Sequence, residues 1–167
     1  MSNRNILKER AIVNARPEKK QFVTEIEDVV VFKLIKTLYA IENKWIKEIV
    51  RVKTIAPIPG LPEFVPGLLN IRGEICSAVN IQIFLEHREI GISDINSAVI
   101  ISGNGVEYAL LADSINGFDS SESFKSDSFP ENFNSLQREF IKGISPNGTL
   151  LLDGDALTQN RKIIIEQ

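Results

Sequence analysis

Residues 56 to 73 read Ala-Pro-Ile-Pro-Gly-Leu-Pro-Glu-Phe-Val-Pro-Gly-Leu-Leu-Asn-Ile-Arg-Gly, and this stretch constrains the fold more than any other. Its four prolines and three glycines exclude a helix, because each proline fixes its own φ and moves the preceding residue out of the helical region. We therefore expect an extended chain with a turn at Gly60, followed by a strand over 68–71. A stiff loop that delivers Arg72 to a strand end is suited to presenting a surface rather than to cradling a phosphate.

The composition is that of an ordinary globular protein: 167 residues, 43% hydrophobic and 25% charged. This fits one domain or two small domains packed together, and it excludes global disorder. The longest unbroken apolar run, Tyr108 to Ala112, is far too short to span a membrane, and the polar N-terminus is not a secretory signal. One cysteine cannot form a disulfide framework, so we expect a cytoplasmic protein.

The charge is distributed unevenly along the chain. The first twenty residues hold six Lys or Arg against Glu9 and Glu18, a balance of +4, so the remainder carries −7 to reach the total of −3. An acidic body is a poor nucleic-acid binder, because phosphate contacts supply most of that affinity. Two interpretations of the basic leader stay open: a solvated helix and linker, or a contact with an anionic lipid surface or an acidic partner.

Most of the chain consists of short, β-branched runs bounded by turn residues, which is typical of strands. Asn104-Gly105 favours a hairpin between its flanking runs, because both residues tolerate positive φ. The turn expected at 35–37 is unusual, since it lacks Gly or Asn. The expected strands cover 29–34, 38–41, 68–71, 74–81, 98–101, 106–111, 140–144 and 149–152.

Helical patterns are short and few. We expect helices over 5–16, over 42–51 as an amphipathic helix, and over 155–159, with a long loop over 119–139. Many short strands with minor helices predict an all-β barrel or sandwich.

Residues suited to catalysis are scarce. His87, the single histidine, lies in a charged turn, and Cys76 lies within a predicted strand as a small apolar residue. Asp153-Gly154-Asp155 lacks the rest of a calcium loop and instead suggests a helix cap. Glu42 and Glu48 fall on different faces of the helix expected there, which argues against a shared site for acid–base catalysis. We therefore predict no enzyme activity, no cofactor and no metal.

The sequence resembles the CheW family of bacterial chemotaxis adaptors over about 130 residues in the same order. The stretch from Pro59 to Gly73 is the most specific part of the resemblance. The other matching segments are 30–34, 38–41, 46–50, 108–115, 141–144 and 150–157. The helix and proline before residue 28 are similar to the leader of some longer family members.

The resemblance implies two packed five-stranded SH3-like barrels, with residues 1–27 as an N-terminal helix and linker, residues 28–167 as the CheW-like domain and an approximate division near 84–97. It implies a non-enzymatic cytoplasmic adaptor that couples the cytoplasmic tip of chemoreceptors to the regulatory domain of a CheA-type histidine kinase. Such an adaptor would be recruited to membrane-associated receptor arrays without inserting into the membrane. By the match of motifs, the partner-binding residues are Ile46, Glu48, Gly67, Arg72 and Gly73.

Physical chemistry adds Val50 to this site, because a helical receptor tip calls for an apolar groove with a charged rim, which Ile46 and Val50 would line. Glu48 either orients Arg72 through an ion pair or faces the partner directly. Trp45 is either a core residue or an exposed contact, and the family tends to have small or polar residues at its position.

Several positions depart from the family pattern. Ser77 and Asn80 stand where the family has Pro and Asp, and Gly154 stands where an apolar strand residue is expected, so the last strand is predicted to end early. These departures leave open an adaptor in another pathway, such as pilus motility, phototaxis or development. Two other classes stay open: a small-barrel domain that binds a ligand or nucleic acid, and an enzyme that uses His87.

Overall fold

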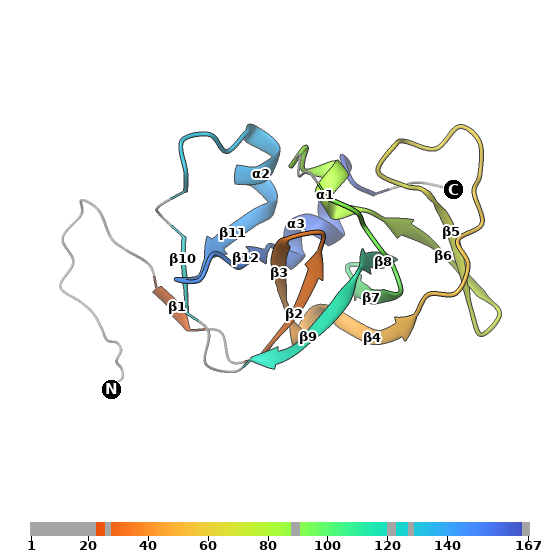
Figure 1. Ribbon diagram of the computed structural model, residues 1–167, viewed down its shortest axis with the longest axis horizontal. Coiled ribbons are helices and arrows are strands. Elements are labelled where there is room, and N and C mark those ends of the chain that lie inside the picture. The colour runs from red at the N-terminus through yellow and green to blue at the C-terminus, as the bar shows by residue number, and fades with distance from the viewer. Residues whose placement is uncertain (1–22, 26–27, 88–90, 120–122, 127–128, 165–167) are drawn as a thin grey trace.

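The computed structural model describes residues 23–25, 28–87, 91–119, 123–126 and 129–164; the helix expected over 5–16 lies outside these ranges. The described chain is mostly β-strand, arranged in two sheets that lie side by side (Figure 1). The first sheet has the order β1-β10-β11-β12-β3-β2-β9, and the second has the order β4-β7-β8-β6-β5. The expected all-β fold of two packed barrels with short helices is confirmed, although the first sheet has seven strands because the short β1 and β10 extend it.

The strands are β1 Val23–Glu25, β2 Val29–Leu34, β3 Thr37–Glu42, β4 Ile46–Arg51, β5 Gly67–Ile71, β6 Glu74–Val79, β7 Ser97–Gly103, β8 Val106–Ala112, β9 Ser114–Asp119, β10 Ser123–Lys125, β11 Ile141–Ile144 and β12 Leu150–Leu152. The helices are the 3-10 turn η1 Asn43–Trp45 and the short α-helices α1 Ile81–Phe84, α2 Ser135–Phe140 and α3 Gly154–Gln159.

The chain passes from the first sheet into the second and back again. It leaves the seven-stranded sheet after β3, forms the whole five-stranded sheet from β4 to β8, and returns at β9. The segment 84–97, where we expected an approximate division, therefore connects α1 to β7 inside the five-stranded part. The two sheets instead separate at 42–46 and at 112–114.

Alternating residues of the strands build three separate apolar clusters, which explains why several strands are apolar on both faces. In β8, Ala109 and Leu111 belong to the cluster of the five-stranded sheet, whereas Tyr108 and Leu110 belong to the large central cluster. The central cluster also holds Phe32 from the first sheet, so it is the apolar seam that joins the two barrels.

The helix expected over 42–51 is wrong, because only Asn43–Trp45 form a single 3-10 turn and Ile46–Arg51 form strand β4. The apolar spacing fitted a helix for a specific reason. Ile46 lies opposite Ile101 of β7 and Glu48 lies opposite Ile100, so Lys47 is the extra residue of a β-bulge. The bulge interrupts the period of two, and the interruption imitates a helical pattern.

The turns follow the expected chemistry at most positions. Asn104 and Gly105 have φ of 50° and 77° and close the β7–β8 hairpin as predicted. The β2–β3 hairpin is instead closed by Ile35 and Lys36, with Ile35 at φ 58°, although β-branched residues rarely adopt positive φ. In its described part, the loop expected over 119–139 contains strand β10 and most of α2, which its polar composition did not indicate.

Two helices begin at residues that the sequence marked as departures or caps. The side chain of Asn80 accepts a hydrogen bond from the Ile83 N–H, so the amide replaces the usual carboxylate as the cap of α1. Asp153 accepts hydrogen bonds from the N–H groups of Asp155 and Ala156 at the start of α3, which confirms the predicted cap. The last strand does end early, because β12 stops at Leu152.

The proline segment is not helical, as expected, but it turns twice, at 59–60 and at 63–64, rather than running extended with one turn, and it is anchored at both ends. Gly60 has φ 88° and forms the expected turn. Ala56 pairs with Leu68 through two backbone hydrogen bonds of 2.9 Å, which fastens the start of the segment to β5. At the other end, the Val65 N–H donates to the Pro62 carbonyl and the Val65 side chain enters the central cluster.

Candidate partner-binding site

The site is built around the tip of the β5–β6 hairpin. Ile71 pairs with Glu74, so Arg72 and Gly73 alone form the turn, with φ of 51° and 89°. The Asn70 side chain accepts a hydrogen bond of 2.9 Å from the Gly73 N–H, which stabilises this turn from below. The side chain of Arg72 is 72% exposed at the tip. The hairpin therefore presents a guanidinium group to solvent on a short, rigid support.

Arg72 is joined to Glu48 across the gap between β5 and β4. Its Nη2 lies 2.6 Å from both carboxylate oxygens of Glu48, which is 27% exposed. The hydrogen bond from Arg72 lowers the pKa of the Glu48 carboxyl below its ordinary value, and the same contact raises the pKa of Arg72. Of the two roles considered for Glu48, the structure shows the contact that orients Arg72.

A groove runs between the two outermost strands of the five-stranded sheet. β4 and β5 stand at opposite ends of the strand order, and the hollow between them has a volume of about 640 Å³. Glu48 and Val50 line one side of this groove, and Arg72 lines the other. The structure thus brings three of the six predicted residues together around one opening.

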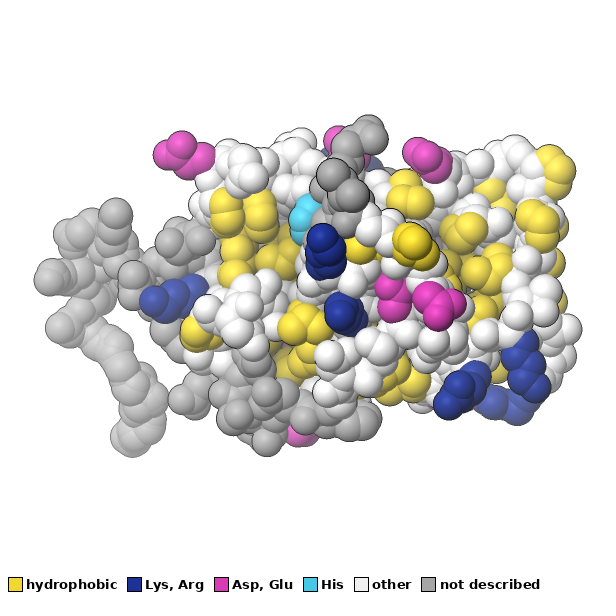
Figure 2. Space-filling model, in the orientation of Figure 1, with side chains coloured by type: hydrophobic (Ala, Val, Ile, Leu, Met, Phe, Trp, Pro, Cys, Tyr) yellow, Lys and Arg dark blue, Asp and Glu magenta, His cyan; other side chains and the backbone are white. Residues whose placement is uncertain are grey.

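Positive charge gathers at the mouth of this groove. Arg51 and Lys53 are exposed and line it together with Arg72. In the space-filling view, Lys and Arg side chains collect at the end of the molecule where Figure 1 places β4 and the β5–β6 hairpin (Figure 2). Arg72 is paired with Glu48, whereas Arg51 and Lys53 form no ion pair with another described residue, so the mouth of the groove carries uncompensated positive charge.

Ile46 does not share the groove with Val50. The bulge at Lys47 places Ile46 on the same face as Ile49, and both pack against the central cluster. Val50 instead packs against the cluster of the five-stranded sheet. Ile46 is partly buried between the barrels, so its position favours a role in packing.

Gly67 and Gly73 have different structural roles. Gly67 is buried, and a β-carbon built on it would lie 2.2 Å from the carbonyl oxygen of Ala56, so only glycine permits the close contact of the proline segment with β5. Gly73 has open space around it and needs glycine for its positive φ. Gly67 thus shapes the base of the hairpin and Gly73 shapes its tip.

Of the two roles predicted for Trp45, the structure shows packing against the core, but sequence reasoning missed the glycines that it covers. Its indole packs against the central cluster and covers Gly103 and Gly154, with the Lys44 ammonium group 5.5 Å from the ring centroid. Trp45 and Gly154, both unusual for the family, are therefore linked, because the indole ring fills the space that a side chain at position 154 would need. The signal available in the sequence was that both positions depart from the family pattern, a large residue at 45 and a residue without a side chain at 154.

The other residues with side chains suited to catalysis either contact other groups or lie far from one another. His87 Nδ1 lies 3.3 Å from the Tyr39 hydroxyl, and Cys76 is partly buried, which raises the pKa of its thiol. Glu42 pairs with Lys142 rather than approaching Glu48. Within the described ranges, no group of three or more His, Cys, Asp or Glu side chains is placed to hold a metal ion.

The fold and the site define the class: a double β-barrel protein with an exposed, charged hairpin. A family model described as CheW-like domain matches residues 28–162. The chain is 28% identical over 128 residues to "Chemotaxis protein CheW" of Treponema pallidum (strain Nichols), covering 74% of this chain and 75% of that protein. It also resembles the crystal structure of the scaffolding protein TtCheW from Thermoanaerobacter tengcongensis, with a TM-score of 0.65 and 21% identity over 83% of this chain and 97% of that one.

This chain belongs to the CheW-like domain family. Members of this family are scaffolds rather than enzymes, so the protein is a non-catalytic scaffold. In the part of the chain that the structure describes, no helix combines the length and the apolar character needed to cross a membrane.

Proposed function

We propose that this protein is a cytoplasmic adaptor that couples the helical tip of chemoreceptors to the regulatory domain of a CheA-type histidine kinase. Family membership supports this role, as does the similarity to the chemotaxis protein CheW of Treponema pallidum. The observation that carries the proposal is Arg72, which is held outward on a two-residue turn beside the β4–β5 groove. An adaptor of this kind works by assembly, and simultaneous engagement of several partners raises avidity by about 10² to 10⁴.

The proposed contact surface consists of Glu48, Val50, Arg72 and Gly73, with Gly67 supporting the hairpin and Ile46 supporting β4. Arg72 offers a planar group with several donors to a partner carboxylate or carbonyl oxygen. The neighbouring groove, which Val50 and Leu69 line among charged residues, accepts apolar side chains of the partner. Recruitment through such contacts would bring the protein to membrane-associated receptor arrays.

Binding of the purified kinase regulatory domain and of a receptor-tip peptide tests this proposal. The matched variants are Arg72→Ala, which removes the exposed guanidinium, and Lys125→Ala, which removes an exposed cation on the other sheet. We expect Arg72→Ala to weaken at least one partner by about 10- to 100-fold, because hydrogen bonds to charged groups contribute about 1.5–3 kcal/mol. Equal affinities for wild type and both variants would contradict the assigned site.

The pathway is a separate question. An adaptor for pilus motility, phototaxis or development would use the same kind of surface with a different kinase. Parallel binding assays with kinase domains from each pathway would distinguish them. Binding to single-stranded nucleic acid at moderate salt would instead favour the small-barrel alternative, which the acidic body of the chain disfavours.

A further inference from the structure

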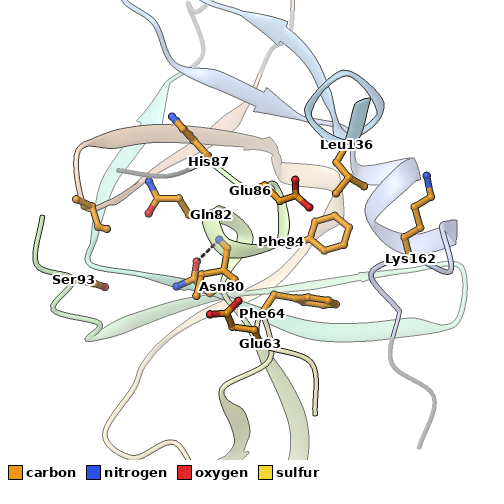
Figure 3. A pocket seen from close by; sticks show the side chains of 12 residues that line it. Glu63, Phe64, Asn80, Gln82, Phe84, Glu86, His87, Ser93, Leu136 and Lys162 are labelled. Carbon is orange, nitrogen blue, oxygen red and sulfur yellow. Dashed lines mark hydrogen bonds between the residues drawn. The ribbon is translucent and has the colours of Figure 1, made fainter. Parts of the chain in front are cut away.

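The largest of the hollows described here lies away from the β5–β6 hairpin. It has a volume of about 870 Å³ and opens between α1, α2 and the proline segment (Figure 3). It contains none of the residues proposed above for partner binding. Residues from both barrels line it, because Ile35 and Leu136 belong to the seven-stranded part and Phe64 belongs to the segment that enters the five-stranded part.

The floor of this groove is aromatic and aliphatic. Phe64 and Phe84 pack edge to face with their ring centroids 4.9 Å apart, and Leu136 lies beside Phe84 across the opening (Figure 3). Ile83 of α1 also lines the groove and is 41% exposed, which is unusual for a large apolar residue in an otherwise buried helix. The groove thus leaves apolar surface uncovered.

Ile35 lines the same groove in a strained conformation. Its φ of 58° is rare for a β-branched residue, and its N–H is held by a hydrogen bond of 2.8 Å to Asp113 Oδ2. Its side chain packs so closely on Gly91 that a β-carbon there would lie 2.4 Å from Ile35 Cγ2. Strain of this kind persists where the surroundings enforce it, and it gathers at ligand-binding positions.

The charged rim of the groove is acidic. Lys162 forms an ion pair with Glu139, with 2.8 Å between its Nζ and a carboxylate oxygen. By contrast, no ion pair joins Glu63 or Glu86 to another residue of the described ranges. Both carboxylates are exposed beside the apolar floor (Figure 3).

The walls favour a helical occupant over an extended one. Each lining residue within the described ranges lies in a helix, a turn or a loop, and none of them lies in a strand, so the described walls offer no sheet edge to which a peptide strand could add. An apolar trough between short helices instead accepts the ridge of another helix.

We propose that this groove is a second docking surface, which binds an amphipathic helix of a partner protein through an apolar stripe flanked by Lys or Arg. The inference extends the proposed function, because an adaptor that links two partners needs two surfaces that do not overlap. The apolar stripe covers Ile83, Phe64 and Leu136, and the basic flank faces Glu63 and Glu86.

The test uses two synthetic peptides of about 18 residues, both made of leucine and lysine. One has leucines at helical spacing, and the other has the same composition in scrambled order. In an NMR titration of the full chain, we expect the amphipathic peptide alone to shift amide resonances of residues 63–64, 82–87 and 136. Equal shifts with the scrambled peptide, or shifts confined to other parts of the chain, would overturn the proposal.

Variants locate the contact. Ile83→Lys should weaken binding of the amphipathic peptide at least about tenfold. The matched control is Ile92→Lys, at an isoleucine that is 92% exposed and outside the groove, and it should have no effect. Glu86→Lys should weaken the leucine–lysine peptide and strengthen a leucine–glutamate analogue, which gives a second readout if Ile83→Lys lowers the melting temperature. Unchanged affinity in both groove variants would refute the inference.

Arg72→Ala separates this inference from the proposed function. It should leave binding of the amphipathic peptide unchanged while weakening the kinase domain or the receptor peptide. If Arg72→Ala weakens neither partner but Ile83→Lys still weakens the peptide, the groove stands and the hairpin assignment fails. If Arg72→Ala weakens the peptide and Ile83→Lys does not, the groove assignment fails.

Discussion

The indole ring of Trp45 covers Gly154 so closely that a β-carbon on Gly154 would lie 2.2 Å from Trp45 Cδ1. Trp45 precedes the first strand of the five-stranded sheet, whereas Gly154 opens the helix that follows the last strand of the other sheet. The contact therefore fastens the crossing between the two barrels to the C-terminal helix.

This contact predicts that Gly154→Ala destabilises the protein although alanine favours helix. We expect a loss of about 1–3 kcal/mol, because the added methyl group overpacks a filled site. Urea denaturation measures the change. In a Trp45→Leu background the loss should shrink, and a double-mutant cycle with no coupling energy would show that the indole does not set the requirement for glycine.

The two hairpin glycines should respond differently to alanine. Gly67→Ala places a methyl group 2.2 Å from the Ala56 carbonyl oxygen, so we expect a loss of about 1–3 kcal/mol and release of the proline segment, seen as faster amide exchange at Ala56 and Leu68. Gly73→Ala meets no neighbouring atom and carries only the cost of positive φ, of about 1 kcal/mol. Equal losses for the two variants would contradict these roles.

The Glu48–Arg72 pair predicts a change in titration. Since the hydrogen bond from Arg72 lowers the pKa of Glu48, the favourable interaction is fully present above the ordinary glutamate pKa and is lost as the pH falls through the lowered value. NMR titration of the Glu48 side-chain carboxyl should show that Arg72→Ala returns this pKa toward its ordinary value. Arg51→Ala is the control, because Arg51 lines the same groove but does not lower the pKa of Glu48. A Glu48 pKa that is the same in wild type and Arg72→Ala would mean that the pair does not form in solution.

The packing of Ile46 predicts a structural effect. Ile46→Asp would place a carboxylate against the central cluster, so we expect a loss of about 2–4 kcal/mol in unfolding free energy. Chemical denaturation monitored by circular dichroism tests this. Arg51→Asp, at an exposed residue of the same strand, is the matched control. Wild-type stability in Ile46→Asp would show that Ile46 is a surface contact instead.

Sequence patterns were reliable where local chemistry decides the structure. Asn104-Gly105 specified its hairpin, and Asp153 specified the start of α3, because turn and cap geometry depends on a few neighbouring residues. They failed at β4, since a bulge depends on pairing with β7, which is distant in sequence. The grouping of Glu48, Val50 and Arg72 was predicted, whereas the separation of Ile46 from them was not.

The amino-acid sequence alone determined that the proline segment is not helical, that it turns at Gly60 and that it leads into a strand ending at Arg72, because proline fixes φ and glycine permits positive φ wherever they stand. Tertiary structure alone decided which carboxylate meets Arg72, which face of β4 enters the groove, and why Gly154 must lack a side chain. Those features arise from contacts between residues far apart in the chain, and such contacts exist only after the two sheets have packed on their shared apolar seam.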